Sequence, residues 1–220
     1  MAVAGKFFTR SVGKSRLDVE TVILVEGSDD GFFLDEVLTS IGALPENVGV
    51  CVAEGKDNFA SLLQAMLKAP TFTNGKIRRY AVIRDVDDNL AKCKAECAKL
   101  FNGAGEPVPE PAAFASRNDG RHNGLFLMPS GAETGSLETL ALGTLQDHPV
   151  LNAAHEYLVS SGEKGGSVDH LDKRRAQALL ASISAPLCNG VGWATRRGLF
   201  DIGSPSLLEL KNFLTTLQQV

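Results

Sequence analysis

Apolar runs that end at a carboxylate constrain the fold of this chain more than any other feature. Residues 21–26 form one such run, which ends at Glu26, and residues 77–84 lead into Asp85 in the same way. A third apolar run lies between them at residues 48–53. Short apolar runs of this kind are typical of strands that are buried on both faces of a parallel sheet.

Helical patterns separate these runs. Apolar residues recur at helical spacing after the first run until Gly42, and further helices are expected at about 59–67 and 90–101. Two more apolar stretches, 112–116 and 124–128, are predicted strands. The resulting order, β-α-β-α-β-α-β-β, predicts an α/β fold in which a mostly parallel central sheet is flanked by helices on both faces.

The pattern changes after Pro129, where helices replace strands. Helices are expected at 136–146, 150–160, 170–183 and 206–219. We therefore divide the chain into an N-terminal arm at 1–19, an α/β domain at 20–130 and a C-terminal helical extension at 131–220 that packs on this domain.

Composition and charge exclude several classes of protein. The 220 residues carry 22 Lys and Arg against 26 Asp and Glu, so the net charge of −4 does not indicate a broad basic surface for non-specific DNA binding. Aromatic residues make up only 6%, which argues against a fold built on stacking nucleotide bases. The apolar stretches fall short of the roughly 20 residues of a membrane helix, so no membrane association is expected.

The four cysteines do not predict a metal site. Cys93 and Cys97 share one face of a helix, but no nearby His completes a zinc site. The N-terminus also lacks the apolar segment of a secretory signal. Reduced thiols in a cytoplasmic protein are therefore expected.

Acidic residues gather where the predicted strands end. Glu26 ends the first strand and Asp30 follows four residues later; Asp85 and Asp87 follow the third, and Glu138 begins a helix after the last. Ligand sites of open α/β sheets lie beyond the carboxyl ends of the strands. Clustered carboxylates repel one another unless a hard cation such as Mg²⁺ or Mn²⁺ neutralises them.

At these residues the sequence resembles the Rossmann-like Toprim domain of topoisomerases, primases, small ribonucleases and OLD-family nucleases. Val25-Glu26-Gly27-x-x-Asp30, followed by Ile83-x-Asp85-x-Asp87, matches its signature over residues 20–130. The remainder resembles a family of small stand-alone Toprim proteins of unknown function, related to the OLD nucleases. The features that carry this second resemblance are Met128-Pro129 with Gly135-x-Leu137-Glu138, the Asp172-Lys173 helix, and Arg197-Gly198-Leu199-Phe200.

The resemblance implies two-metal hydrolysis of phosphodiesters with Mg²⁺ or Mn²⁺ as cofactor. It implies that Glu26, Asp85 and Asp87 bind the metal and that Asp30 and Glu138 complete a second site.

Catalysis of this kind also needs a cation beside the metals to offset charge on the phosphate. Lys173 is the first candidate by resemblance and Lys56 the second, so both join Glu26 as predicted catalytic residues. Two positions depart from the family pattern, because Ser130 and Thr139 stand where acidic residues are common. These departures put one peripheral metal contact in doubt.

Each of these residues also has a simpler interpretation. Asp87-Asp88-Asn89 could simply cap the following helix, and Glu138 could be a first-turn acid that is favoured by the helix dipole. Lys56 could belong to a turn, and Lys173 could lie on a solvated helix face.

Two functions remain open on the sequence. The first is a Mg²⁺-dependent, OLD-like nuclease or phosphodiesterase that acts on DNA or RNA. The second is a non-catalytic Toprim module that binds metal or nucleotide and acts with a partner protein. Neither Tyr80, in a predicted strand, nor Tyr157, in a predicted helix, suits the nucleophile of a topoisomerase. Because the chain has no Walker A motif, an ATPase partner would have to be another chain.

Overall fold

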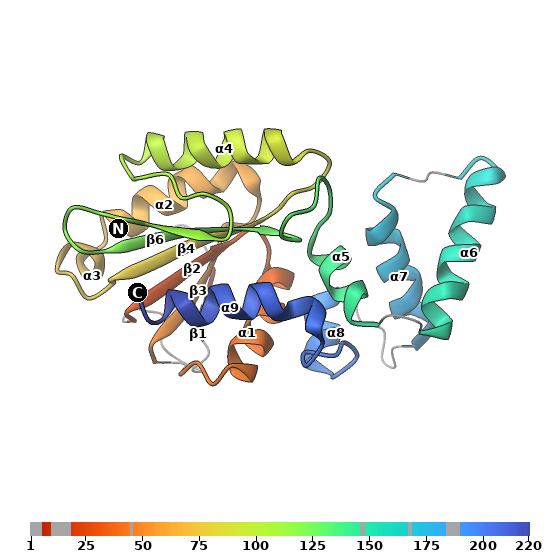
Figure 1. The fold of residues 1–220 in the computed structure, drawn as a ribbon. Helices are drawn as coiled ribbons and strands as arrows, with labels where there is room; N and C mark the ends of the chain where they lie inside the picture. Colours follow the sequence, from red (N-terminus) through yellow and green to blue (C-terminus); the bar gives the residue numbers. More distant parts are fainter. Residues whose placement is uncertain (1–5, 10–18, 45, 146–147, 167–168, 184–189) are drawn as a thin grey trace.

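The computed structural model describes residues 6–9, 19–44, 46–145, 148–166, 169–183 and 190–220. Its centre is a six-stranded sheet with the strand order β1-β3-β2-β4-β6-β5 (Figure 1). The four inner strands are parallel, and the edge strands β1 and β5 are antiparallel to their neighbours. The predicted α/β fold with a mostly parallel sheet is thus confirmed. The strands are β1 (Lys6–Thr9), β2 (Thr21–Val25), β3 (Val48–Val52), β4 (Arg79–Asp85), β5 (Ala113–Ser116) and β6 (His122–Met128).

Helices cover both faces of the sheet in two layers. In Figure 1, α2 and α4 lie above the sheet, whereas α1, α8 and α9 lie below it. The short helix α3 contributes to the same core as α2 and α4. These helices are α1 (Ser28–Ser40), α2 (Phe59–Leu67), α3 (Pro70–Thr73), α4 (Leu90–Gly103), α8 (Val191–Arg196) and α9 (Leu208–Leu217), with 3₁₀ turns η1 (Lys56–Asn58) and η3 (Pro205–Leu207).

The alternation of side chains along each strand divides the buried residues into two cores. Ile23 and Val25 of β2 pack in the core under α1, α8 and α9. Val22 and Leu24 of the same strand pack in the opposite core, with α2, α3 and α4. This period of two explains why the strands read as continuous apolar runs, since both of their faces are buried.

Helix α9 packs on the sheet through a close aromatic contact. The rings of Phe213 and Phe114 stack with their centroids 4.7 Å apart, and Phe126 of β6 lies beside them. Gly124 makes this approach possible, because a β-carbon at that position would lie 2.9 Å from both Phe114 and Phe213.

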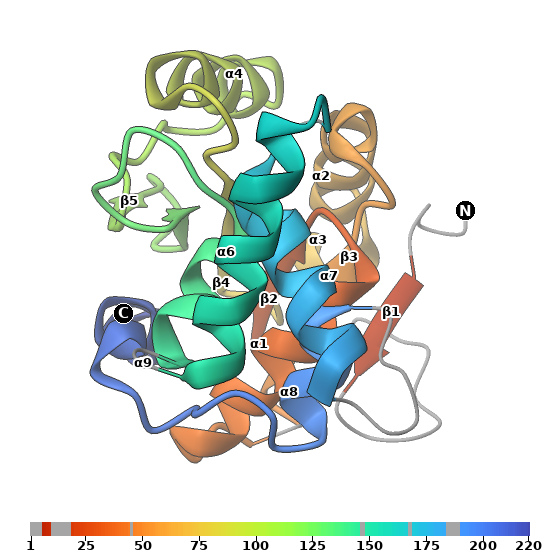
Figure 2. The ribbon, with the colours of Figure 1, turned by 90° about the vertical axis from the view of Figure 1, so that its right-hand side faces the viewer.

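A helical hairpin stands beyond the carboxyl ends of the strands. Helices α6 (Pro149–Glu163) and α7 (Leu171–Ile183) pack against each other, and α7 also packs against α5 (Leu137–Leu142). The turn η2 (Gly143–Leu145) follows α5. Figure 1 shows this hairpin at one end of the molecule, and Figure 2, viewed from that end, shows it in front of the sheet.

Several local features differ from the sequence prediction. The sequence pattern does not predict β1, which lies within the expected N-terminal arm and pairs with β3 through backbone hydrogen bonds. It also misses the short helices α3 and α8, which are too short to show a helical period. Helix α6 ends at Glu163, three residues beyond the predicted end at residue 160.

Other predictions hold or fall outside the described residues. Cys93 and Cys97 share the buried face of α4, as expected, whereas Cys188 lies outside the described residues. In the described part of the chain, no helix combines the length and apolar character that crossing a bilayer requires. The domain boundaries at residues 19 and 130 stay a prediction.

Candidate functional site

The predicted acidic residues converge at the carboxyl edge of the sheet. Glu26 directly follows β2, and Asp85 is the last residue of β4, which pairs with β2 in parallel. Asp30 lies in the first turn of α1 and Glu138 in the first turn of α5. Asp87 lies two residues beyond the end of β4. The topology therefore brings all five carboxylates to one edge, as open parallel sheets do for their ligand sites.

Asp85 connects the end of β4 to the start of α5. Its Oδ1 accepts a hydrogen bond from the backbone N–H of Leu137 at 2.9 Å. Burial raises the pKa of Asp85 well above its ordinary value, and the negative charges of Asp30 and Glu138 raise the pKa further. Asp85 thus lies close enough to both carboxylates for mutual repulsion to matter.

Asp30 is the most enclosed of the five carboxylates, with 8% of its surface exposed. Its Oδ2 accepts a hydrogen bond of 2.7 Å from the backbone N–H of Gly27 and so caps α1. Burial raises the pKa of Asp30 to about 7; the Gly27 hydrogen bond opposes this rise, and the charges of Glu26, Asp29 and Glu138 add to it.

Glu26 has one oxygen that is buried and unsatisfied. Its Oε2 is shielded from solvent and has no hydrogen-bond partner among the described residues. Burial raises the pKa of Glu26, although the positive charges of Lys56, Arg84 and Lys173 oppose the rise. A buried carboxylate oxygen without a donor is costly, so this oxygen calls for a cation or a proton.

Both the backbone and the side chain of Asp87 make contacts that fix its position. It has a left-handed φ of 58° and exchanges two backbone hydrogen bonds with Gly135, of 2.7 and 2.8 Å. Its carboxylate forms an ion pair with Lys56, which raises the pKa of that lysine. Asp87 does not cap the next helix, because the side chain of Asn89 accepts the capping bond from the N–H of Lys92.

Glu138 is oriented by the residue that caps its helix, Ser136. The hydroxyl of Ser136 donates a hydrogen bond of 2.6 Å to Glu138 Oε2. Its place in the first turn of α5 also suits the helix dipole, so the simpler interpretation of Glu138 agrees with the structure.

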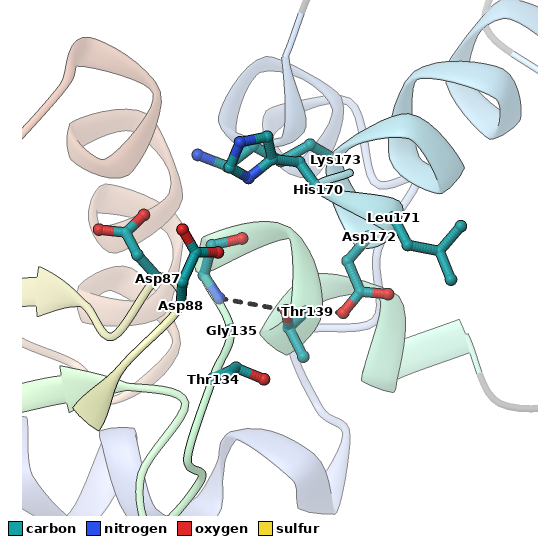
Figure 3. Close-up of a pocket in the computed structure, with 10 residues that line it drawn as sticks. Asp87, Asp88, Thr134, Gly135, Thr139, His170, Leu171, Asp172 and Lys173 are labelled. Carbon is teal, nitrogen blue, oxygen red and sulfur yellow. Dashed lines mark hydrogen bonds between the residues drawn. The ribbon is translucent and has the colours of Figure 1, made fainter. Parts of the chain in front are cut away.

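Lys173 faces the acidic cluster from α7. It lines a pocket of about 440 Å³, in which Figure 3 shows Asp87 and Asp88 on one side and Asp172 and Lys173 on the other. Burial raises the pKa of both Glu26 and Asp85, and the positive charge of Lys173 opposes this rise. Lys173 is therefore not confined to a solvated helix face.

Asp172 is a residue of this pocket that the sequence prediction omits. Its Oδ2 accepts a hydrogen bond of 2.8 Å from the Thr139 hydroxyl, and its Oδ1 forms an ion pair of 3.1 Å with Arg175. Asp172 thus places a carboxylate beside Thr139, the position at which the resemblance predicts an acidic residue. The signal for it was its place next to Lys173 on the same helix.

Comparison with protein families identifies the family of this chain. Residues 20–219 match the DUF3226 family, which is described as a protein of unknown function. The chain belongs to the DUF3226 family. This confirms the predicted membership of a family of unknown function. The comparison with curated proteins found no match for this DUF3226 protein.

Two solved structures of the C-terminal region of the OLD protein from Xanthomonas campestris pv. campestris also match. One, phased with mercury, is 16% identical, covers 91% of this chain and 98% of its own, and has a TM-score of 0.40. The other, phased with iodine, is 17% identical, covers 93% and 100%, and has a TM-score of 0.41. At these values no residue role transfers from the OLD protein to this chain.

The chemistry of the donor set fits a hard cation. All five predicted ligands are carboxylates, the preferred donors of Mg²⁺ and Mn²⁺, and Glu26 has an unsatisfied buried oxygen. Among the described residues, however, no three acidic, His or Cys side chains are already placed to hold an ion.

Asp29 belongs to the scaffold rather than to the cluster. Its Oδ1 accepts a backbone hydrogen bond of 2.9 Å from Gly192 at the start of α8, which fixes α8 against α1. A β-carbon at Gly192 would overlap the backbone oxygen of Asp29.

We therefore expect Gly192→Ala to lower the free energy of unfolding by about 3 kcal/mol, as overpacking of a close contact does. Urea denaturation measures the change. Gly103→Ala is the matched control, because a β-carbon at Gly103 meets nothing within 4 Å. Equal stability of the two variants would contradict the close contact between α1 and α8.

The raised pKa of Asp30 predicts how the stability of the metal-free protein depends on pH. Asp30 ionises near its ordinary value of 3.8 in the unfolded chain and near 7 in the folded protein. Between these values the folded protein binds more protons than the unfolded chain, so the free energy of unfolding falls as the pH rises. Asp30 alone should contribute about 4 kcal/mol to this fall, because one pKa unit corresponds to about 1.4 kcal/mol. The raised pKa values of Glu26, Asp29 and Asp85 add to it.

Denaturant unfolding in EDTA between pH 4 and pH 8 measures this fall. Asp30→Asn should reduce it, since an amide does not ionise. A stability that rises with pH in the wild type would contradict the raised pKa of Asp30.

Proposed function

We propose that this DUF3226 protein hydrolyses phosphodiester bonds in DNA or RNA, with Mg²⁺ or Mn²⁺ as cofactor. The observation that carries the proposal is the convergence of five carboxylates with Lys173 at the carboxyl edge of the sheet. Burial and mutual repulsion make this cluster unfavourable without a cation. A cluster that is costly to the fold, with Asp87 and Lys173 lining the pocket beside it, is a functional candidate.

Glu26, Asp85 and Asp87 would hold the metal, and Asp30 and Glu138 would complete a second site. When bound, divalent ions supply Lewis acidity that activates water and offsets charge on a phosphoryl oxygen.

Glu26 suits the role of general base. Its pKa is raised by burial, which favours acceptance of a proton. The shielded Oε2 would bind the metal, and Oε1 would accept the proton of the attacking water.

The two lysines suit different roles. Lys56 forms an ion pair with Asp87, so it would position that carboxylate. Lys173 lines the pocket and would donate to a non-bridging oxygen of the phosphate, where negative charge develops in the transition state. An ATP-driven step would require a partner ATPase, because this chain has no Walker A motif.

A nuclease assay tests the proposal. Single-stranded and double-stranded DNA and RNA are incubated with the protein in Mg²⁺, in Mn²⁺ and in EDTA, beside Glu26→Gln purified in the same way. We expect cleavage of at least one substrate in a divalent metal, none in EDTA and none by the variant. No cleavage of any substrate would reject the hydrolase and leave the non-catalytic module that binds metal or nucleotide.

A further inference from the structure

A second pocket adjoins the carboxylate site and is bounded by an aromatic pair. It has a volume of about 270 Å³ and lies between α1, α7 and α8. Its lining includes Phe32, Trp193, Leu180, Gln177, Lys173 and Glu138. The proposed hydrolytic reaction does not use Phe32, Trp193 or Gln177.

Trp193 and Phe32 form a fixed platform in this pocket. Their ring centroids are 5.0 Å apart at an interplanar angle of 44°, and the guanidinium of Arg196 lies 5.2 Å from the Phe32 ring. Trp193 still exposes 46% of its surface. The backbone N–H groups of Gly192 and Trp193 both donate to Asp29 Oδ1, which fixes the backbone that carries this exposed ring.

The platform is continuous with the proposed catalytic site. Lys173 lines both pockets, and Glu138, one of the predicted metal ligands, also lines the second. A phosphate at Lys173 would therefore leave the adjoining nucleoside beside Trp193. We propose that this pocket binds one unpaired nucleobase of the substrate strand, which stacks on Trp193. The substrate is therefore single-stranded at this position, and this inference rests on the proposed function.

The chemistry of the lining favours a neutral aromatic ring with a polar edge. The carboxylates of Asp29 and Glu138 disfavour an anion in the pocket, while the amide of Gln177 can both donate to and accept from the edge of a base. In a duplex the bases are paired in the interior of the double helix, so they cannot enter the pocket. Since every base has a π-face, stacking on one ring would tolerate any sequence.

The intrinsic fluorescence of the protein reports on this contact directly, because Trp193 is the one tryptophan in the sequence. Oligodeoxythymidylate is titrated in Mg²⁺ at low temperature, with strand integrity checked on a gel. An abasic strand of the same length is the control, since it keeps the phosphates and lacks the bases. We expect quenching by the first and little by the second; equal quenching by both would overturn the proposal.

Variants separate this inference from the proposed function. Trp193→Ala should raise the KM for single-stranded substrate, and the Kd from anisotropy of a labelled strand, about tenfold to a hundredfold, while Trp193→Phe should retain most of the affinity. Tyr157→Ala is the control, because Tyr157 is also an exposed aromatic residue but lies on α6 away from both pockets. Unchanged KM and Kd in Trp193→Ala would reject the nucleobase pocket and leave the hydrolase standing. Base-dependent quenching without any cleavage would support the pocket and reject the hydrolase.

Discussion

Asp85→Asn should abolish metal-dependent cleavage and at the same time stabilise the metal-free protein. The amide would still accept the hydrogen bond from the N–H of Leu137, so the connection between β4 and α5 survives. The variant removes a charge that burial and the carboxylates of Asp30 and Glu138 disfavour. Loss of activity accompanied by a gain in stability is characteristic of a residue kept for binding rather than for folding.

Cleavage rates in Mg²⁺ and denaturant unfolding in EDTA measure the two effects. The gain in stability should shrink as the pH falls, because Asp85 of the wild type then takes up a proton and loses its unfavourable charge. Asp57→Asn is the matched control, since Asp57 is exposed and lies in η1, at one residue from Lys56. A destabilised but active Asp85→Asn would show that Asp85 serves the fold alone.

Lys173→Ala should reduce cleavage by about 10²–10³-fold, the usual cost of losing one charge-stabilising donor. Lys173 lines the pocket, and its charge acts on both Glu26 and Asp85. Its removal leaves the carboxylates in place, so divalent metal binding and folding should stay nearly unchanged.

Single-turnover cleavage, calorimetric metal binding and thermal unfolding together test this expectation. Lys164→Ala is the control, because Lys164 follows α6 in the same helical hairpin and lies outside both pockets. If Lys173→Ala cleaves at the rate of Lys164→Ala, the catalytic role of Lys173 fails and Lys56 becomes the remaining candidate.

The strand-end residues were predictable because local sequence determines them. An apolar run buried on both faces identifies β2 and β4, and parallel pairing of neighbouring strands brings Glu26 and Asp85 to one edge. The same reasoning places Asp87, which follows β4 by two residues. Topology alone thus accounts for the centre of the candidate site.

The contacts around this centre were not predictable because they join distant segments. Asp29 caps α8 from 163 residues away, and Lys56 reaches Asp87 across 31 residues. Asp172 joins the site only because α7 packs against α5. Helix α8, which carries Trp193, has six residues and no helical period to detect. Tertiary packing determines these contacts between distant segments, and they cannot be inferred from a single sequence.

Direct binding of Mn²⁺ tests most directly whether this edge of the sheet is a metal centre. Isothermal titration calorimetry is carried out at pH 8 on the wild type and on the double variant Asp85→Asn, Asp87→Asn. We predict that the wild type releases or takes up heat with saturable binding of Mn²⁺, and that the double variant shows none while remaining folded. Saturable binding of equal affinity in the folded double variant would contradict the assignment of these carboxylates as the metal site.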